Sequence, residues 1–84
     1  MPKMAVDWSP QARADLRAID RETAMQILRA LDRYLSTGAG DVKKLQPPRH
    51  EFRLRVGDYR VLFVPREELA IEVVRVRHRR EAYR

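Results

Sequence analysis

The sequence predicts an α+β domain with the chain order β-α-α-β-β-β, in which two N-terminal helices pack on one face of an antiparallel sheet. Three observations predict it. Apolar residues recur at helical spacing in the first half of the chain, they alternate with polar residues in the second half, and a Gly-Asp pair separates two alternating runs. A chain of 84 residues suits one domain with a modest core, so we assign residues 1–84 to a single domain.

The first half of the chain predicts one strand and two helices. Residues 4–8 form a short apolar run, and Ser9-Pro10 then supplies a helix cap and a proline at the first helical position. A short helix over residues 10–18 follows, and Asp20 can cap a second helix. The apolar positions of that second helix, and the glycines that end it, are Ala24, Ile27, Leu28, Leu31, Tyr34, Leu35, Gly38 and Gly40.

The second half of the chain predicts the rest of the sheet. Residues 41–50 have the composition of an irregular connection that contains prolines, and strict alternation begins after them. Residues 51–56 and 59–64 flank Gly57-Asp58, which predicts a tight hairpin with a type II′ turn. The elements after the hairpin are a turn at residues 65–68, a last strand from Leu69 to Arg77 and a tail at residues 78–84.

The two-residue loop also predicts the register of the hairpin, with Val56 opposite Tyr59 and Arg55 opposite Arg60. Cross-strand partners lie on the same face of a sheet. Because Arg60 then points away from the helices, we expect its replacement by alanine to leave the fold intact. The apolar face toward the helices contains Phe52, Leu54, Val56, Tyr59, Val61 and Phe63, and the opposite face contains Glu51, Arg53, Arg55 and Arg60.

The arginines of this opposite face have two interpretations. Like charges that lie directly opposite each other destabilise a sheet. The face is either solvated, with Glu51 or Asp58 softening the repulsion, or an anion site at which a phosphate relieves it. The last strand favours the anion site. Its residues Arg75, Arg77 and Arg79 share one parity and extend the basic surface, and we expect Val74 and Val76 on the buried face.

The composition is strongly basic, with a net charge of +6, and 15 of the 18 cations are arginines. Arginine suits bidentate phosphate contacts, although a GC-rich genome would also raise its content. The chain has no cysteine, no apolar run near the roughly 20 residues of a membrane span and no signal-peptide pattern, so we expect a cytoplasmic protein without membrane contact. It has no metal-ligand spacing and no nucleotide-binding motif, so we expect neither a metal nor a cofactor.

Two groups in the tail are suited to proton transfer. Histidine exchanges a proton near neutral pH, and His78 lies among arginines, although a lone histidine at a strand end is also a common structural residue. Tyr83 offers a phenol for stacking on a base or for proton transfer.

Three segments resemble the RelE/ParE superfamily of toxins from microbial toxin–antitoxin pairs. They are Lys44-Leu45, the hairpin from Phe52 to Phe63 and the ending from Val76 to Tyr83, and the likeness extends over essentially the whole chain. The resemblance implies a microbial-RNase-like fold and a metal-independent, ribosome-dependent mRNA endonuclease that inhibits translation, in which the ribose 2′-OH attacks the scissile phosphate. It also implies two partners, which are mRNA on the ribosome, with contacts to 16S rRNA, and a small, acidic and partly disordered cognate antitoxin.

The resemblance implies a set of site residues as well. Arg60 matches an arginine that binds the scissile phosphate, Arg79 matches a second arginine of the site, and Tyr83 matches a tyrosine that stacks on the base or aids proton transfer. Glu51 and His78 depart from RelE and resemble the YoeB-like branch, where they would serve as base and acid. The further cations expected to hold RNA phosphates are Arg53, Arg55, Arg75, Arg77, Arg80, Lys43 and Lys44.

Alternatives stay open for the roles and for the function. Neighbouring arginines should lower the pKa of Glu51 and make it a poorer base, which leaves Glu51 to organise Arg53 and Arg55, with Tyr83 as the base. The first alternative function is a ParE-like toxin, which binds DNA gyrase and has no catalytic site. The second is a non-catalytic nucleic-acid-binding module, against which the scarcity of aromatic stacking platforms argues.

Overall fold

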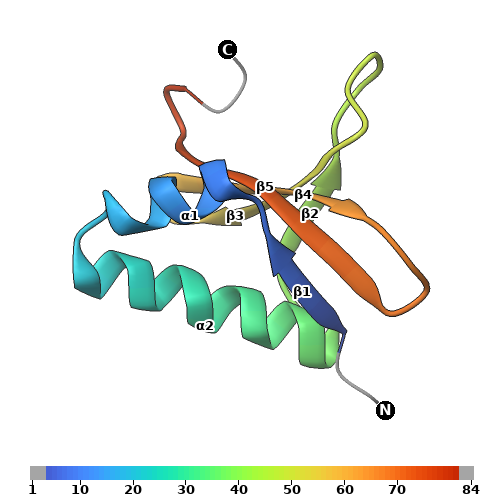
Figure 1. Cartoon of the computed structure of the whole chain (residues 1–84), viewed down its shortest axis with the longest axis horizontal. Helices are drawn as coiled ribbons and strands as arrows, with labels where there is room; N and C mark the ends of the chain where they lie inside the picture. Colours follow the sequence, from blue (N-terminus) through green and yellow to red (C-terminus); the bar gives the residue numbers. More distant parts are fainter. Residues whose placement is uncertain (1–3, 82–84) are drawn as a thin grey trace.

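Two helices and a five-stranded mixed sheet make up residues 4–81, which are the part of the chain that the computed structural model describes (Figure 1). The sheet has the strand order β1-β5-β4-β3-β2, in which β1 runs parallel to β5 and all other neighbours are antiparallel. The elements are β1 (Ala5–Trp8), α1 (Pro10–Arg17), α2 (Arg21–Thr37), β2 (Asp41–Lys44), β3 (Phe52–Val56), β4 (Tyr59–Pro65) and β5 (Ala70–His78).

The ends of both helices are set by the capping residues that the sequence predicts. The Ser9 hydroxyl accepts a hydrogen bond from the Ala12 N–H at 3.0 Å, and the Asp20 carboxylate accepts one from the Thr23 N–H at 3.1 Å. Helix α2 ends at Gly38, whose φ of +79° is a left-handed conformation that glycine adopts without steric cost. These caps confirm the predicted positions of both helices.

The hairpin between β3 and β4 also has the predicted register. Val56 lies opposite Tyr59, and Arg55 lies opposite Arg60. Gly57 has a φ of +56°. Asp58 has a negative φ, since no residue other than glycine has a positive φ within residues 4–81. A positive φ followed by a negative φ is the sign pattern of a type II′ turn. The register of the hairpin was therefore encoded by its two-residue loop.

Two details of the sheet differ from the prediction. Residues 41–44, expected to be irregular, form β2 and pair with β3. This strand has one apolar residue in four, so no alternation in the sequence marks it. Strand β1 is parallel to its neighbour, not antiparallel, because β1 and β5 are far apart in the chain and no local turn sets their relative direction.

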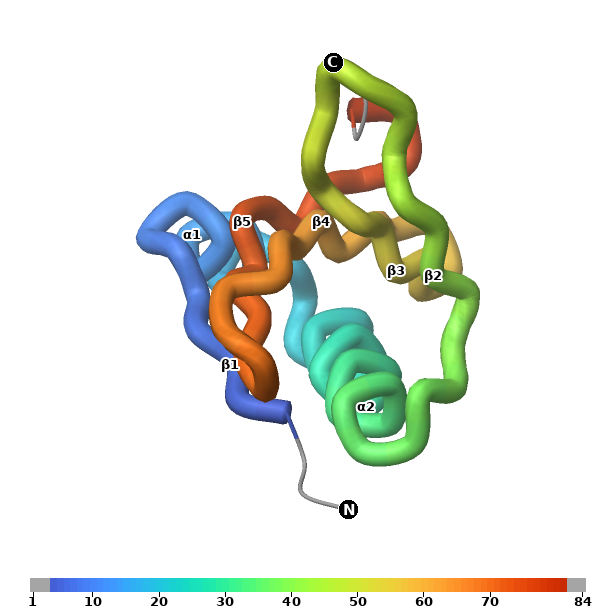
Figure 2. Tube along the Cα trace, turned by 90° about the vertical axis from the view of Figure 1, so that its right-hand side faces the viewer, coloured from blue at the N-terminus to red at the C-terminus, as the bar shows by residue number. Residues whose placement is uncertain are grey.

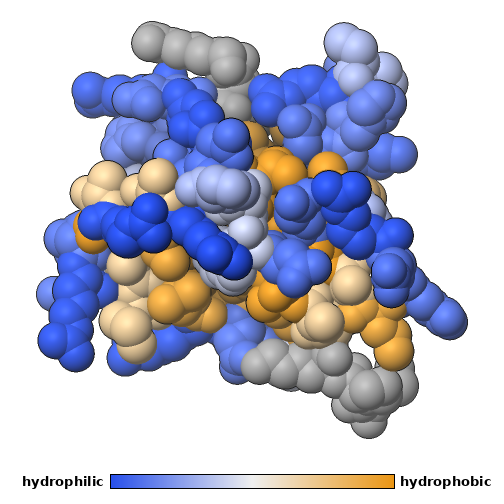
Figure 3. Space-filling view, viewed as in Figure 1, coloured by the Kyte–Doolittle hydropathy of each residue, from blue (hydrophilic) through white to orange (hydrophobic). Residues whose placement is uncertain are grey.

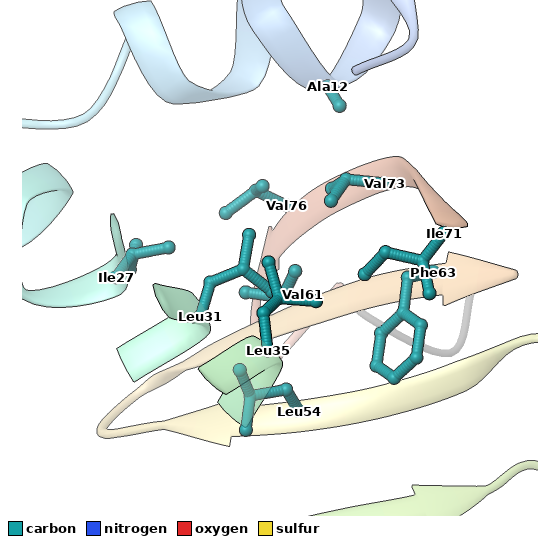
Figure 4. Close-up of a cluster of buried hydrophobic side chains, with 10 residues drawn as sticks. All are labelled: Ala12, Ile27, Leu31, Leu35, Leu54, Val61, Phe63, Ile71, Val73 and Val76. Atoms are coloured by element: carbon teal, nitrogen blue, oxygen red, sulfur yellow. The ribbon is translucent and has the colours of Figure 1, made fainter. Parts of the chain in front are cut away.

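The core lies between α2 and one face of the sheet, with α1 adding to it from the side of β5 (Figures 2 and 4). We call the face of the sheet that carries this core the inner face and the opposite face the outer face. Both helices run roughly antiparallel along the molecule (Figure 1). The buried apolar residues of the cluster are Ala12, Ile27, Leu31, Leu35, Leu54, Val61, Phe63, Ile71, Val73 and Val76.

Helix α1 lies against the edge of β5 beyond the end of β1. Strand β1 pairs with β5 only as far as Val73, so the next edge groups of β5 need other partners. The Ser9 hydroxyl donates to the Val74 carbonyl at 2.9 Å, and the Asp15 carboxylate accepts from the Val76 N–H at 2.9 Å. The side chains of the first helix therefore satisfy a sheet edge that would otherwise be open.

A β-bulge in β5 corrects the predicted faces of that strand. Leu62 pairs with Arg75, but the next residue, Phe63, pairs with Val73, so Val74 is an extra residue. The bulge shifts the alternation, and Val73 and Ile71 face the core where strict alternation from Val76 would have placed Val74. Val74 is half-buried on the outer face.

Candidate functional site

The outer face carries two rows of cations next to the hairpin turn. Two structural segments, the loop between β2 and β3 and the chain after β5, rise from this face on the side opposite α2 (Figure 2). We call the row nearest the turn the first row, and the row two residues further along the strands the second row. The first row contains Asp41, Arg55, Arg60 and Arg77, and the second row contains Lys43, Arg53, Leu62 and Arg75.

Arg60, at the centre of the first row, is buried with 9% of its surface exposed. Its guanidinium group donates hydrogen bonds to the carbonyls of Gly57 and Tyr59, both at 2.9 Å. Arg60 lies on the outer face, as predicted, but its side chain bends back onto the turn and is not exposed to solvent. Because these hydrogen bonds hold the hairpin turn, we now expect the replacement of Arg60 by alanine to destabilise the hairpin as well as to remove a charge.

Carboxylates partly neutralise the two rows. Arg53 pairs with Asp41 at 3.3 Å, Arg77 pairs with Glu81 at 3.3 Å, and Arg79 lies 3.8 Å from Asp58, a longer contact. Within residues 4–81, Arg55 and Lys43 have no carboxylate partner, and both are exposed. Both remain available to an anion, and so does the exposed residue Arg80.

Two of the expected phosphate-binding residues are engaged elsewhere. The Arg75 guanidinium forms a bidentate pair with Asp15 of α1, with distances of 2.8 Å and 2.9 Å. Burial alone would raise the pKa of Asp15, but its hydrogen bonds with Arg75 and the Val76 N–H lower it overall. Lys44 lies opposite Phe52 on the inner face, with its ammonium 6.0 Å from the ring centre, so it does not join the basic surface.

Glu51 lies at the other end of the outer face and pairs with Arg49 at 3.2 Å. The hydrogen bond from Arg49 lowers the pKa of Glu51, against a smaller effect of burial. A carboxylate with a lowered pKa is a poorer base, as the sequence led us to expect. Its arginine partner, however, is Arg49 and not Arg53 or Arg55, because Glu51 precedes β3 at the end farthest from the turn.

His78 lies on the inner face, opposite Tyr59. The two rings are in edge-to-face contact, with centroids 5.5 Å apart, and the imidazole Nδ1 accepts a hydrogen bond from the Arg80 N–H at 3.3 Å. The structure therefore does not bring Glu51 and His78 together, since they lie on opposite faces and at opposite ends of β3. Tyr83, the third candidate for proton transfer, lies outside the described residues.

A cleft that the sequence analysis did not predict lies at the Glu51 end of the outer face. It has a volume of about 470 Å³, with a floor from Val64 and Val74 and a wall from the loop before β3, contributed by Pro48, Arg49, His50 and Glu51. Val74 reaches this floor only because of the bulge. A Val-Val pair that interrupts the alternation of the last strand is the one sequence signal that marks the position. In the space-filling view, apolar surface shows between hydrophilic groups at the upper part of the molecule (Figure 3).

No helix within the described residues is long and apolar enough to cross a membrane.

The family comparison covers nearly the whole chain. Residues 6–83 match the family model described as the ParE toxin of the type II toxin–antitoxin system parDE. No curated protein matches the sequence significantly.

Solved toxin structures share the fold. A chain of the RelBE2 toxin–antitoxin complex from Mycobacterium tuberculosis has a TM-score of 0.79 at 22% identity, over 92% of this chain and 99% of that chain. The archaeal RelE–RelB complex from Pyrococcus horikoshii has a TM-score of 0.75 at 23% identity, over 96% and 100% of the two chains. The chromosomal ParDE system of P. aeruginosa has a TM-score of 0.60 at 18% identity, over 90% and 96%. At these identities the likeness shows a shared fold.

Proposed function

Because the chain belongs to the ParE toxin family of type II toxin–antitoxin systems, we propose that it arrests growth by binding a protein target, DNA gyrase, and not by cleaving mRNA. The observation that carries this proposal is the separation of Glu51 from His78. General acid–base catalysis needs both groups within hydrogen-bond reach of the reacting atoms. Five residues of extended chain separate Glu51 from the row of Val56 and His78, which is about 17 Å, and the two side chains lie on opposite faces.

The environment of each group supports the same proposal. The ion pair with Arg49 lowers the pKa of Glu51, which weakens it as a base. His78 packs edge-to-face on Tyr59, as a structural histidine does. The apolar cleft beside Glu51 suits an apolar side chain of a protein target better than a phosphate.

Cleavage of mRNA on the ribosome is the second candidate function. The alignment of Arg55, Arg60 and Arg77 in one row favours it, because cations in a row can stabilise the charge that builds on a scissile phosphate. In this alternative, Arg79 assists the row and Tyr83 transfers the proton.

A cognate antitoxin is the partner that the family implies. We propose that its apolar side chains enter the groove between β1 and α2, which has a volume of about 170 Å³ and is lined by Val6, Trp8, Leu28, Leu31, Asp32 and Leu35. The net charge of +6 favours an acidic antitoxin segment.

Expression of the toxin in bacteria, with and without the double substitution Glu51→Gln and His78→Phe, distinguishes the two functions. Phenylalanine keeps an aromatic contact with Tyr59, so we expect the double variant to fold. Glutamine has the same size as Glu51, so the wall of the cleft keeps its shape. A gyrase-binding toxin should therefore arrest growth in both forms, inhibit DNA supercoiling by purified gyrase and leave mRNA intact in primer extension. Cuts within translated codons by the wild type, lost in the double variant, would overturn the proposal in favour of RNA cleavage.

A further inference from the structure

We propose that the hairpin end of the outer face binds the phosphate backbone of duplex DNA, so that the toxin contacts both gyrase and the DNA that gyrase holds. The DNA contact stands on the charges of this face, and only the link to gyrase rests on the function proposed above. The binding site consists of Lys43, Arg55 and Arg77, together with Arg79, which lies just after the end of β5 next to the hairpin turn.

The spacing of these cations suits a regular series of phosphates. Neighbouring side chains within a row are about 5 Å apart, and the two rows are separated by two residues, or about 7 Å. Arg55 and Arg77 lie on either side of Arg60 in the first row, and Lys43 lies in the second. The cations thus cover a patch across four strands of the sheet.

The acids on this patch are poor competitors for the cations. Asp41, Glu81 and Asp58 are each more than half exposed, at 53%, 56% and 68%. Their arginine partners differ, since the side chain of Arg79 is 56% exposed and those of Arg77 and Arg53 are 25% and 12% exposed. Ion pairs with exposed carboxylates are screened by salt, so a phosphate can compete with Asp58 for Arg79 and with Glu81 for Arg77. Arg55 and Lys43 have no carboxylate to give up within residues 4–81.

Arg60 acts here as a positioning residue beneath the patch. Its hydrogen bonds to the carbonyls of Gly57 and Tyr59 hold the hairpin turn. The hairpin turn also holds the chain after β5, because the Asp58 carbonyl accepts a hydrogen bond from the Arg79 N–H at 2.7 Å. Arg60 therefore determines where Arg79 stands, and its buried positive charge adds to the field of the patch.

The aromatic residues favour duplex DNA over single-stranded RNA as the ligand. Single-stranded nucleic acids are held largely by stacking of bases on aromatic rings. Within residues 4–81 every aromatic ring of Trp, Tyr or Phe belongs to the core or packs against it, so the patch offers no stacking platform. A duplex instead presents its phosphates at regular intervals, and their neutralisation depends only on cations.

The test is fluorescence anisotropy of the purified full-length toxin with a labelled 30-base-pair duplex over a series of salt concentrations. We expect the logarithm of affinity to fall linearly with the logarithm of salt concentration, with a slope of about −3 to −4 for the contacts of four cations. The double variant Lys43→Gln with Arg55→Gln should bind roughly 50-fold more weakly at 0.1 M salt and reduce the slope by about 2.

A matched control comes from α2, on the opposite side of the sheet. Arg21→Gln with Arg29→Gln removes an equal number of positive charges, also from exposed positions. It should change duplex affinity by less than about threefold. Equal losses in the two double variants would overturn the proposal, because binding would then follow net charge alone. Tighter binding of a single-stranded RNA of equal length would overturn it in favour of RNA. Duplex binding at this patch without inhibition of gyrase would support the DNA site and refute the gyrase function.

Discussion

The two ends of the outer face differ in chemistry although the same strands build them. Next to the hairpin turn, Arg55, Arg60 and Arg77 lie side by side, and no apolar side chain separates them. At the other end, Val64 and Val74 form the floor of a cleft, and the charges beside them, Arg49 and Glu51, neutralise each other. One face of a small sheet can therefore present two recognition surfaces, a cationic one and an apolar one.

The boundary between the two ends is a buried residue. Leu62 belongs to the outer face, yet only 2% of its surface is exposed. Its cross-strand neighbours Arg53 and Arg75 have aliphatic stems long enough to cover it while their charged groups reach other partners. The outer face thus has a small packed layer of its own, which links the cationic end to the cleft.

Removal of this boundary should have the largest effect on stability. Leu62→Ala deletes a buried side chain and leaves a cavity, so we expect a loss of about 2–4 kcal/mol in the free energy of unfolding, measured by urea denaturation. Leu69→Ala is the control, because Leu69 is 50% exposed, and it should cost no more than about 0.5 kcal/mol. Similar costs for the two substitutions would show that the outer face has no packed layer.

The ion pair between Arg75 of the second row and Asp15 of α1 should have the next largest effect on stability. Asp15→Ala removes the partner of Arg75 and leaves the Val76 N–H unpaired at the sheet edge, which should cost about 1–3 kcal/mol. Asp7→Ala, at an exposed position of β1, is the control. An equal and small cost for both would mean that α1 does not depend on this contact.

The same pair predicts a dependence of stability on pH. Because the pKa of Asp15 is lower in the folded chain, its contribution is fully present above the unfolded value of about 3.9. It is lost as the pH falls through the lower folded pKa. Stability of the wild type should therefore fall more steeply below pH 4 than that of Asp15→Asn, and parallel curves would contradict this.

The hydrogen bonds by which Arg60 holds the hairpin turn should contribute less to stability. Arg60→Ala removes two hydrogen bonds to turn carbonyls and should cost about 1–2 kcal/mol. Arg55→Ala, its exposed cross-strand neighbour, should be nearly neutral because it also relieves repulsion. If Arg60→Ala proved as neutral as Arg55→Ala by thermal unfolding, Arg60 would have no structural role.

The cleft should show the smallest effect on stability and a clear effect on function. Val74→Ser makes the half-buried floor polar, with a cost of less than about 1 kcal/mol. We expect the inhibition of gyrase to weaken by about tenfold, as the loss of one apolar contact in an interface would cause. Duplex binding at the other end should stay within twofold, and a parallel loss of both activities would mean that the two ends form one site.

Local signals in the sequence were sufficient for most of the fold. Ser9 and Asp20 mark helix starts through side-chain oxygens that bond three residues ahead, and Gly57-Asp58 determines a hairpin register through its own backbone angles. The shared face of Arg55 and Arg60 followed from that register. Strand β2 carried no such signal, since four residues with one apolar position do not show alternation.

The candidate site was less predictable, because an alternation of faces that is extrapolated along β5 cannot reveal a β-bulge. Val74 was expected in the core and instead lines the cleft. Glu51 and His78 were expected to act together as base and acid. His78 instead shares a face with Tyr59 and not with Arg60.

What the sequence determined by itself is therefore everything that depends on contacts within a few residues: the helix ends, the turn, the hairpin register and the basic character of the second half. The tertiary structure alone decided that β1 lies parallel to β5, that Asp15 engages Arg75 and that Arg60 is buried. The physical reason is the distance along the chain over which the interactions act. Caps and turns satisfy backbone groups locally, whereas the partner of an edge strand or of a charged side chain is chosen by what the packed core brings beside it.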